Sequence, residues 1–149
     1  MRSGEEKEAG VKVVSKYISL KSKGRCDIID ITPQVNKALS ETEMQDGTVT
    51  VFVQGSTAGL TTVEYERGLI KDLEDLFERI APSNISYAHN GTWGDGNGHS
   101  HIRASALGAS LTVPFAKGAL TLGTWQQIVF IDFDNRPRSR KLLAQFIGQ

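Results

Sequence analysis

The sequence predicts an α+β fold in a single compact domain, with a large mixed or mostly antiparallel β-sheet and two main helices. Candidate strands follow one another in runs instead of alternating strictly with helices, which is typical of this class. Only two segments have a clear helical pattern, and 149 residues make about one domain of ordinary size. Because residues 1–10 carry charge and glycine with few apolar side chains, we expect a flexible tail there and the folded domain over 11–149.

The first third of the domain predicts three strands and one helix. β-Branched side chains mixed with polar ones are typical of half-buried strands, and such stretches lie at 11–20, 26–31 and 48–53. Between the second and third strands, Thr32 and Pro33 have the pattern of a helix start, with threonine as N-cap and proline at the first helical position.

The clearest helix is predicted at 63–80. Leucines, Phe77 and Ile80 recur there at steps of three and four residues, charged side chains fill most other positions, and Pro82 ends the pattern. The segments that follow are predicted as a short extended piece, a Gly-rich loop, and either a strand or a short helix, at 85–89, 90–98 and 101–107.

The last third predicts strands joined by turns. Lys117 and Gly118 form the turn of a hairpin, and a polar turn at 134–138 precedes the final strand. Apolar and β-branched side chains favour strands at 111–115, 119–122, 125–133 and 141–147.

Composition excludes several classes of protein. Lysine plus arginine and aspartate plus glutamate each number 17, so the formal charge is 0, unlike that of a dedicated duplex-DNA binder or a polybasic membrane-surface protein. The only cysteine, Cys26, excludes an internal disulfide and any cysteine-pair zinc module. No apolar run approaches the ~20 residues of a membrane span, and we expect a cytoplasmic protein with no nucleic-acid or membrane partner.

The three histidines, His89, His99 and His101, lie within thirteen residues of one another. If 99 and 101 lie on a strand, their i, i+2 spacing points both side chains to one face, and the Gly-rich loop can fold back to bring His89 close. Imidazole is a common zinc ligand, and three imidazoles leave one position open for water or substrate. The spacing therefore favours a divalent metal, zinc first, at these histidines; solvated loop histidines with one half-buried are the alternative.

Other segments have the pattern of anion sites. Ser56 and Thr57 lie between a strand and the long helix, where free backbone N–H groups favour a phosphate; helix N-capping is the alternative. Glu64 then falls in the first helical turn as a base, a metal ligand or, by default, a carboxylate that complements the helix dipole. Arg138 and Arg140 share a face if their segment is extended, and guanidinium groups bind phosphate oxygens in pairs; a solvated turn or a subunit contact is the alternative.

Three short motifs recur in a fixed order: Tyr-Ala-His at 87–89, Asn-Gly-His-Ser-His-Ile-Arg-Ala-Ser at 97–105 and Leu-Gly-Thr-Trp-Gln at 122–126. Together they resemble the secondary thiamine-phosphate synthase family, also called YjbQ-like, over nearly the whole chain. The resemblance implies a compact α+β fold, a homotrimer, metal binding through histidines and a weak or secondary thiamine-phosphate synthase activity. That reaction joins a pyrimidine methyl diphosphate to a thiazole phosphate and releases pyrophosphate, and magnesium can accompany the diphosphate.

The resemblance also implies roles for single residues. His89 and His101 match the most regular histidines of the family, and Glu64 matches a glutamate near the start of its helix. We take these three as candidate catalytic residues. Where the family usually has a histidine, this chain has Gly55, which leaves open a non-catalytic metal- or ligand-binding oligomer, or a metal-dependent hydrolase of a small phosphorylated molecule. The candidate substrate-binding residues are Ser56, Thr57, Asn97, Trp125, Gln126, Arg138 and Arg140. An aromatic face at Trp125 suits a heteroaromatic ring, with core packing as the alternative.

Overall fold

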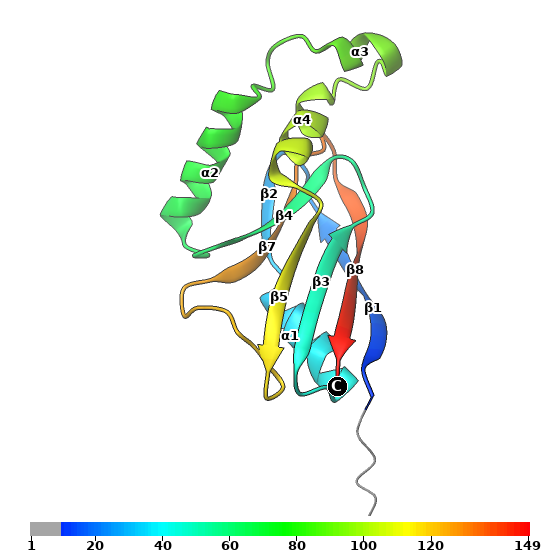
Figure 1. The fold of residues 1–149 in the computed structure, drawn as a ribbon. Coiled ribbons are helices and arrows are strands. Elements are labelled where there is room, and N and C mark those ends of the chain that lie inside the picture. The colour runs from blue at the N-terminus through cyan, green and yellow to red at the C-terminus, as the bar shows by residue number, and fades with distance from the viewer. Residues whose placement is uncertain (1–9) are drawn as a thin grey trace, which may run out of the picture.

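A computed structural model describes residues 10–149 as two β-sheets and four helices (Figure 1). Residues 1–9, where most of the expected tail falls, lie outside the described residues. In chain order the elements are β1 (Lys12–Ser22), β2 (Asp27–Asp30), α1 (Thr32–Thr42), β3 (Gly47–Val53), β4 (Ala58–Val63), α2 (Arg67–Ile80), α3 (Ala88–Trp93), α4 (Gly98–Leu107), β5 (Ser110–Ala116), β6 (Ala119–Leu120), β7 (Gln127–Asp132) and β8 (Arg138–Gly148).

The strands form a five-stranded sheet in the order β1-β8-β3-β5-β6 and a three-stranded sheet in the order β2-β7-β4. Neighbouring strands in both sheets run antiparallel. The α+β class with mostly antiparallel strands is therefore confirmed. The expected large sheet is divided in two because β4 pairs with β7 and not with β3, although β3 and β4 are adjacent in the chain.

The main core lies between the two sheets and α1. The helix buries Val35, Ala38 and Leu39, which share one face of it. They pack with inward side chains of both sheets, among them Phe130 and Phe146. Full burial of a phenylalanine side chain contributes about 1.5–3 kcal/mol, so these rings account for much of the stability of the core.

The three-stranded sheet is covered on both faces. Its second face packs with α2 and α4, where the rings of Phe77 and Phe133 meet edge to face with centroids 4.7 Å apart. A strand that is buried on both faces needs a continuous apolar run instead of alternation, and β7 has this pattern: Ile128 to Ile131 are fully buried.

The long helix begins later than its leucine spacing predicts. Residues 58–63 belong to β4, and α2 starts at Arg67, with Glu66 as N-cap accepting hydrogen bonds from the Gly68 and Leu69 N–H groups. β-Branched Thr61, Thr62 and Val63 pair with β7, and this pairing outweighs the helical signal. The prediction that Ser56 and Thr57 lie directly before a helix is therefore wrong, and Glu64 precedes the helix instead of lying in its first turn.

The segments after α2 and the last strand agree with the prediction only in part. Of the two alternatives for residues 101–107, the helix is confirmed, because α4 spans Gly98–Leu107. The short extended piece and the Gly-rich loop contain α3. The last strand starts at Arg138 and not at 141, because its polar first residues pair with β1 as Ser22↔Arg138 and Leu20↔Arg140.

Over residues 10–149, the helices are all too short or too polar to cross a membrane.

Candidate functional site

The imidazole rings of His89 and His101 lie together, with centroids 4.3 Å apart and planes inclined by 41°. His89 lies in α3 and His101 in α4, and the two helices meet at a tight corner. Gly98 makes this corner possible: its N–H donates to Asn90 Oδ1 at 2.9 Å, and a Cβ at this position would lie 2.5 Å from the Tyr87 Cβ. A larger residue at 98 would push the two histidine-bearing helices apart.

His99 does not join this pair. Residues two apart on an α-helix point about 200° apart, so His99 faces the opposite side of α4 from His101. Its ring is nearly buried and lies 6.3 Å from that of Tyr87. The expectation that both side chains share a face assumed a strand, and the helix overturns it.

The structure therefore assembles two imidazoles and not three. In the part of the chain that is described, no group of three or more His, Cys, Asp or Glu side chains is placed to hold a metal ion. Zinc in proteins takes three or four protein ligands, so the residues of one chain do not by themselves fit a zinc centre.

Each histidine of the pair has an unusual environment. His89 Nδ1 is buried, and within residues 10–149 no group bonds to it; the same holds for Asn97 Oδ1. Burial lowers the pKa of His101 below its ordinary value, and the charge of a protonated His89 would lower it further, while Asp134 and Asp95 oppose the shift. His101 is therefore neutral at pH 7 and can donate from one ring nitrogen and accept at the other.

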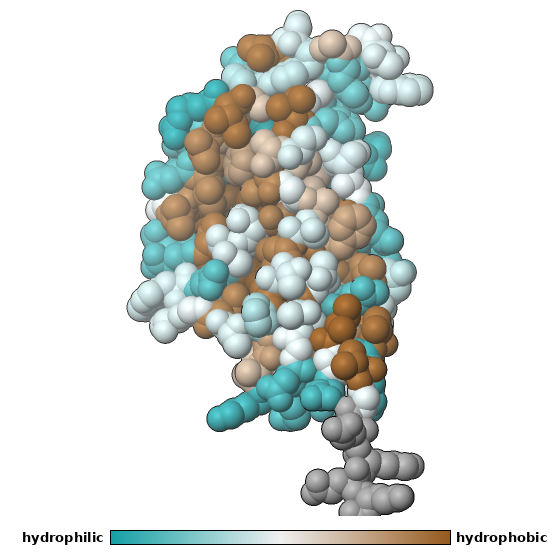
Figure 2. All heavy atoms as spheres, viewed as in Figure 1, coloured by the Kyte–Doolittle hydropathy of each residue, from teal (hydrophilic) through white to brown (hydrophobic). Residues whose placement is uncertain are grey.

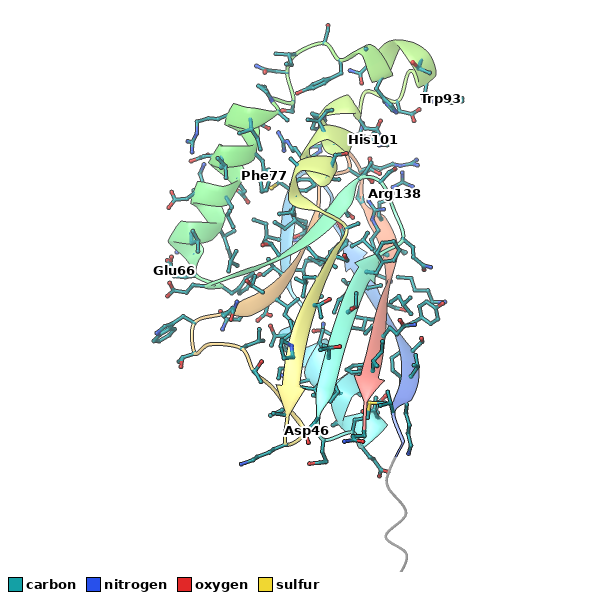
Figure 3. All side chains as sticks on the ribbon, viewed as in Figure 1. Asp46, Glu66, Phe77, Trp93, His101 and Arg138 are labelled. Atoms are coloured by element: carbon teal, nitrogen blue, oxygen red, sulfur yellow. The ribbon has the colours of Figure 1, made fainter. Side chains whose placement is uncertain are left out.

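Two buried aspartates, Asp132 and Asp134, form a network of ion pairs with the partly buried Arg140 and Arg138. Figure 3 labels Arg138 at the same end of the molecule as His101. Arg140 donates to both carboxylate oxygens of Asp132, through Nε and Nη2, each at 2.8 Å. Arg138 binds Asp134 through Nε and Nη2, both at 2.7 Å. The sum of these four charges is zero, and the guanidinium groups expected to bind phosphate are largely engaged by carboxylates.

Thr57 belongs to the same network. Its hydroxyl accepts from Arg140 Nη2 at 2.7 Å and donates to Asp134 Oδ2 at 3.3 Å, so it links the two ion pairs. Burial by itself would raise the pKa of Asp134, but hydrogen bonds from Arg138 and the Asn135 N–H outweigh it and hold the pKa below its usual value. The carboxyl group of Asp134 is thus kept ionised by close donors.

Two hollows open onto this region. The first, about 310 Å³, is lined by His101, Ser56, Gly55 and Ser105 among others. The second, about 240 Å³, is lined by Asp95, Asn97, Asp134, Asn135, Arg136 and Arg138. Gly55, where the resemblance leads us to expect a histidine, shares the hollow of His101, and a Cβ there would lie 3.1 Å from Arg140 Nη1.

The other predicted site residues lie at the opposite end of the three-stranded sheet. The register pairs Ala58 with Asp132 at one end of β4 and β7, and Val63 with Gln127 at the other. Five residues of extended strand separate these ends by about 17 Å. Glu64, Trp125 and Gln126 lie at the Val63 end, where Trp125 is 72% exposed and Gln126 Nε2 donates to Thr62 Oγ1 at 3.1 Å.

The predicted residues therefore divide into two groups that one chain does not bring together. Ser56, Thr57, His89, Asn97, His101, Arg138 and Arg140 lie around the two hollows. The sequence analysis missed Asp132 and Asp134, which organise this end of the molecule. A signal was present: two aspartates at i, i+2 close an apolar strand, and three arginines, at 136, 138 and 140, follow with the same spacing.

Comparison with known proteins identifies relatives over almost the full length of the chain. A UPF0047 protein of Archaeoglobus fulgidus is 39% identical over 86% of this chain and 97% of its own length. The UPF0047 protein YugU of Bacillus subtilis is 33% identical over 89% of this chain and 98% of its own.

Solved structures agree with these relatives. A YbjQ-like protein of unknown function from Sulfolobus solfataricus superposes with a TM-score of 0.89 at 30% identity, covering 94% of this chain and 100% of that one. A YjbQ/UPF0047 protein of Clostridium acetobutylicum superposes with a TM-score of 0.80 at 35% identity, covering 88% and 98%. The family model described as UPF0047 protein YjbQ-like matches residues 16–149, and the chain belongs to this family.

Proposed function

We propose that the His89–His101 end of the molecule is the active site of a weak thiamine-phosphate synthase-type transferase. In this reaction a thiazole nitrogen bonds to the methylene carbon of the pyrimidine while the bond from that carbon to the diphosphate oxygen breaks, and pyrophosphate leaves. The observation that carries the proposal is the pair of imidazoles, 4.3 Å apart, beside a hollow on the surface of α4. We place this activity in the cytoplasm, where phosphorylated precursors are retained.

The pair supplies what departure of a diphosphate requires from side chains. A neutral His101 can donate a hydrogen bond to the leaving oxygen as negative charge develops there. His89, with one ring nitrogen buried and unbonded within the described residues, can hold the orientation of a bound group. Arg136 and Arg138 line the adjoining hollow, where the exposed part of Arg138 can face phosphate oxygens.

Metal ions enter the proposal in two separate ways. Magnesium prefers oxygen ligands, so we expect it to arrive with the diphosphate and not at the imidazoles. A divalent ion such as zinc at His89 and His101 needs at least one further ligand from water, substrate or a second copy of the chain. No step of the reaction above depends on that ion.

A homotrimer remains part of the proposal. Exposed apolar side chains are available for subunit contacts: Val13, Tyr17, Phe52 and Ile147 on the outer face of the five-stranded sheet, and Leu76 and Ile80 on α2. Figure 2 shows apolar side chains over α2 and α4 and next to the start of β1. In such an assembly Glu64 of one copy can approach the histidines of another. Light scattering after size exclusion tests the trimer, and a monomer at every concentration would reject it.

A non-catalytic ligand-binding protein is the second candidate. It is favoured by the engagement of Arg138 and Arg140 with buried aspartates, which leaves few free charges to stabilise a transition state. Release of inorganic phosphate without thiamine phosphate would point instead to the third alternative, a hydrolase.

The experiment incubates the purified protein with both phosphorylated precursors and magnesium, and measures thiamine phosphate by mass spectrometry. We expect turnover above a protein-free control, falling about 100-fold in His101→Asn, since a positioned hydrogen-bond donor to developing negative charge contributes about 10²–10³-fold. Lys37→Ala, an exposed position on α1, serves as the matched control and should keep full turnover. Absence of product would reject the transferase, and equal turnover in His101→Asn would reject its placement at the histidine pair.

A further inference from the structure

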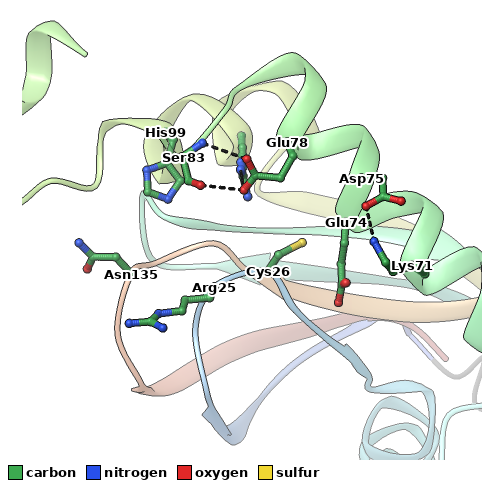
Figure 4. A pocket seen from close by; sticks show the side chains of 10 residues that line it. Arg25, Cys26, Lys71, Glu74, Asp75, Glu78, Ser83, His99 and Asn135 are labelled. Atoms are coloured by element: carbon green, nitrogen blue, oxygen red, sulfur yellow. Dashed lines mark hydrogen bonds and ion pairs between the residues drawn. The ribbon is translucent and has the colours of Figure 1, made fainter. Parts of the chain in front are cut away.

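A larger hollow lies on the other side of α4 from His101, between α2 and the turn that joins β1 to β2 (Figure 4). Its volume is about 550 Å³, within the range typical of small-molecule sites. His99, which does not belong to the His89–His101 pair, lines this hollow. Apart from Asn135, its lining residues are not shared with the two hollows near His101.

The two ends of this hollow differ in charge. Arg25, His99 and Asn135 lie at one end in Figure 4, and Glu74 lies at the other, beyond Cys26. Lys71 and Asp75, next to Glu74, form an ion pair with each other. Arg25 and Glu74 take part in no ion pair with any of residues 10–149, so each presents an uncompensated charge to the hollow.

Hydrogen bonds hold the walls between these ends, where Arg103 and Cys26 are buried and Glu78 is exposed. Arg103 is 2% exposed; its Nε donates to the Ala81 carbonyl at 3.0 Å and its Nη2 to Glu78 Oε1 at 2.7 Å. Glu78 in turn accepts from the Ser83 N–H and hydroxyl. Burial raises the pKa of the Cys26 thiol to about 12, so this part of the floor is uncharged at neutral pH.

The turn that presents Arg25 is held in an unusual conformation. Gly24, Arg25 and Cys26 have φ of 72°, 56° and 63°, three consecutive residues in the left-handed region. Such a run is costly for residues with side chains and persists only where contacts impose it. Here the Arg25 N–H donates to the Asp134 carbonyl at 2.6 Å, and Gly24 packs so closely on Arg136 that a Cβ would lie 2.4 Å from its carbonyl oxygen. The backbone of the turn is thereby pinned at the basic end of the hollow.

We propose that this hollow binds a small zwitterion, with the anionic group between Arg25, His99 and Asn135 and an amine at Glu74. A guanidinium fork suits a carboxylate or phosphate-type group, and a carboxylate without a partner suits an ammonium. Cys26 and the aliphatic parts of α2 side chains contact the chain between the two charges. This site is independent of the proposed transferase, and its test does not use turnover.

The test measures binding by nuclear magnetic resonance of the ¹⁵N-labelled full chain, with 6-aminohexanoate as the zwitterionic probe. Hexanoate and hexylamine carry one of its charges each, and 3-aminopropylphosphonate replaces the carboxylate by a phosphate-type anion. We expect the zwitterion to shift the resonances of residues 25, 26, 74 and 99 and to bind at least tenfold more tightly than either single-charge analogue. A stronger response to the phosphonate would assign the anion as phosphate.

Three variants test whether binding depends on the charges of Glu74 and Arg25. Glu74→Gln should weaken 6-aminohexanoate at least fivefold and leave hexanoate unchanged, while Arg25→Gln should weaken both. Asp72→Asn removes the same charge from the same helix at a position that does not line the hollow, and should have no effect. No shift with any probe, or equal losses for 6-aminohexanoate and hexanoate in Glu74→Gln, would overturn the proposal.

Discussion

Arg140 donates two hydrogen bonds of 2.8 Å to the carboxylate of Asp132, which is completely buried. The pair joins the end of β7 to the start of β8, and through Thr57 it also holds the chain between β3 and β4. These two residues thus tie both sheets together beside the paired histidines.

Loss of this ion pair should destabilise the protein strongly. Arg140→Met leaves Asp132 buried and uncompensated, and we expect a loss of about 3–5 kcal/mol in the free energy of unfolding, measured with urea. The double variant Asp132→Leu with Arg140→Met should recover most of it, because it removes both charges. Lys16→Gln removes the exposed pair with Glu41 and should cost at most about 1 kcal/mol. Equal losses in Arg140→Met and Lys16→Gln would contradict the role of Asp132.

Acid should weaken the fold through Glu78. Hydrogen bonds from Arg103 and then from the Ser83 N–H lower the pKa of Glu78 from its usual 4.5 to about 2. A carboxyl group whose folded pKa is lowered stabilises the protein fully above its unfolded pKa, so this contribution is lost as the pH falls from 4.5 toward 2. We expect the urea-unfolding free energies of wild type and Glu78→Gln to differ at neutral pH and to converge over that interval. Curves that stay parallel would refute this assignment.

The corner between α3 and α4 should depend on Gly98. Gly98→Ala places a methyl group 2.5 Å from the Tyr87 Cβ, and we expect a loss of about 1–3 kcal/mol in thermal or urea unfolding. Gly91→Ala is the matched control in α3, where nothing lies within 4 Å of the added methyl group. Alanine favours helix over glycine by up to about 1 kcal/mol, so this control should be neutral or stabilising. A destabilised Gly91→Ala with a normal Gly98→Ala would reverse the interpretation.

Binding of zinc should depend on His89 and His101 and not on His99. We expect added Zn²⁺ to bind with at most one ion per chain, to be lost in His101→Asn, and to be retained in His99→Asn, since His99 faces the other side of α4. Metal analysis of the dialysed protein measures both effects. Full retention in His101→Asn would remove this residue from any metal site.

The sequence predicted most of the strands because their information is local. β-Branched runs and the apolar spacing of Leu73, Phe77 and Ile80 depend only on near neighbours. The helix does start at Thr32 and Pro33, but the prediction that Thr32 is the N-cap is wrong: Ile31 is the N-cap, and the Thr32 hydroxyl accepts from the Ile128 N–H. Residues 58–62 were not predicted as a strand, and Val63 was assigned to the helix, because the pairing of this segment with β7, more than sixty residues away, leaves no periodic trace in so short a segment. Arg138 and Arg140 were assigned to phosphate for a similar reason, since their partners Asp132 and Asp134 are buried only after folding.

By itself, the sequence determined the α+β class, the family motifs and the clustering of three histidines along the chain. Only the tertiary structure decided that His101 lies against His89 and faces one hollow while His99 faces another, because a two-residue step points to one side on a strand and to opposite sides on a helix. It also decided that Glu64 and Trp125 lie far from the histidines within one chain. Side-chain direction depends on the conformation that packing selects, and packing joins residues that are distant in the sequence.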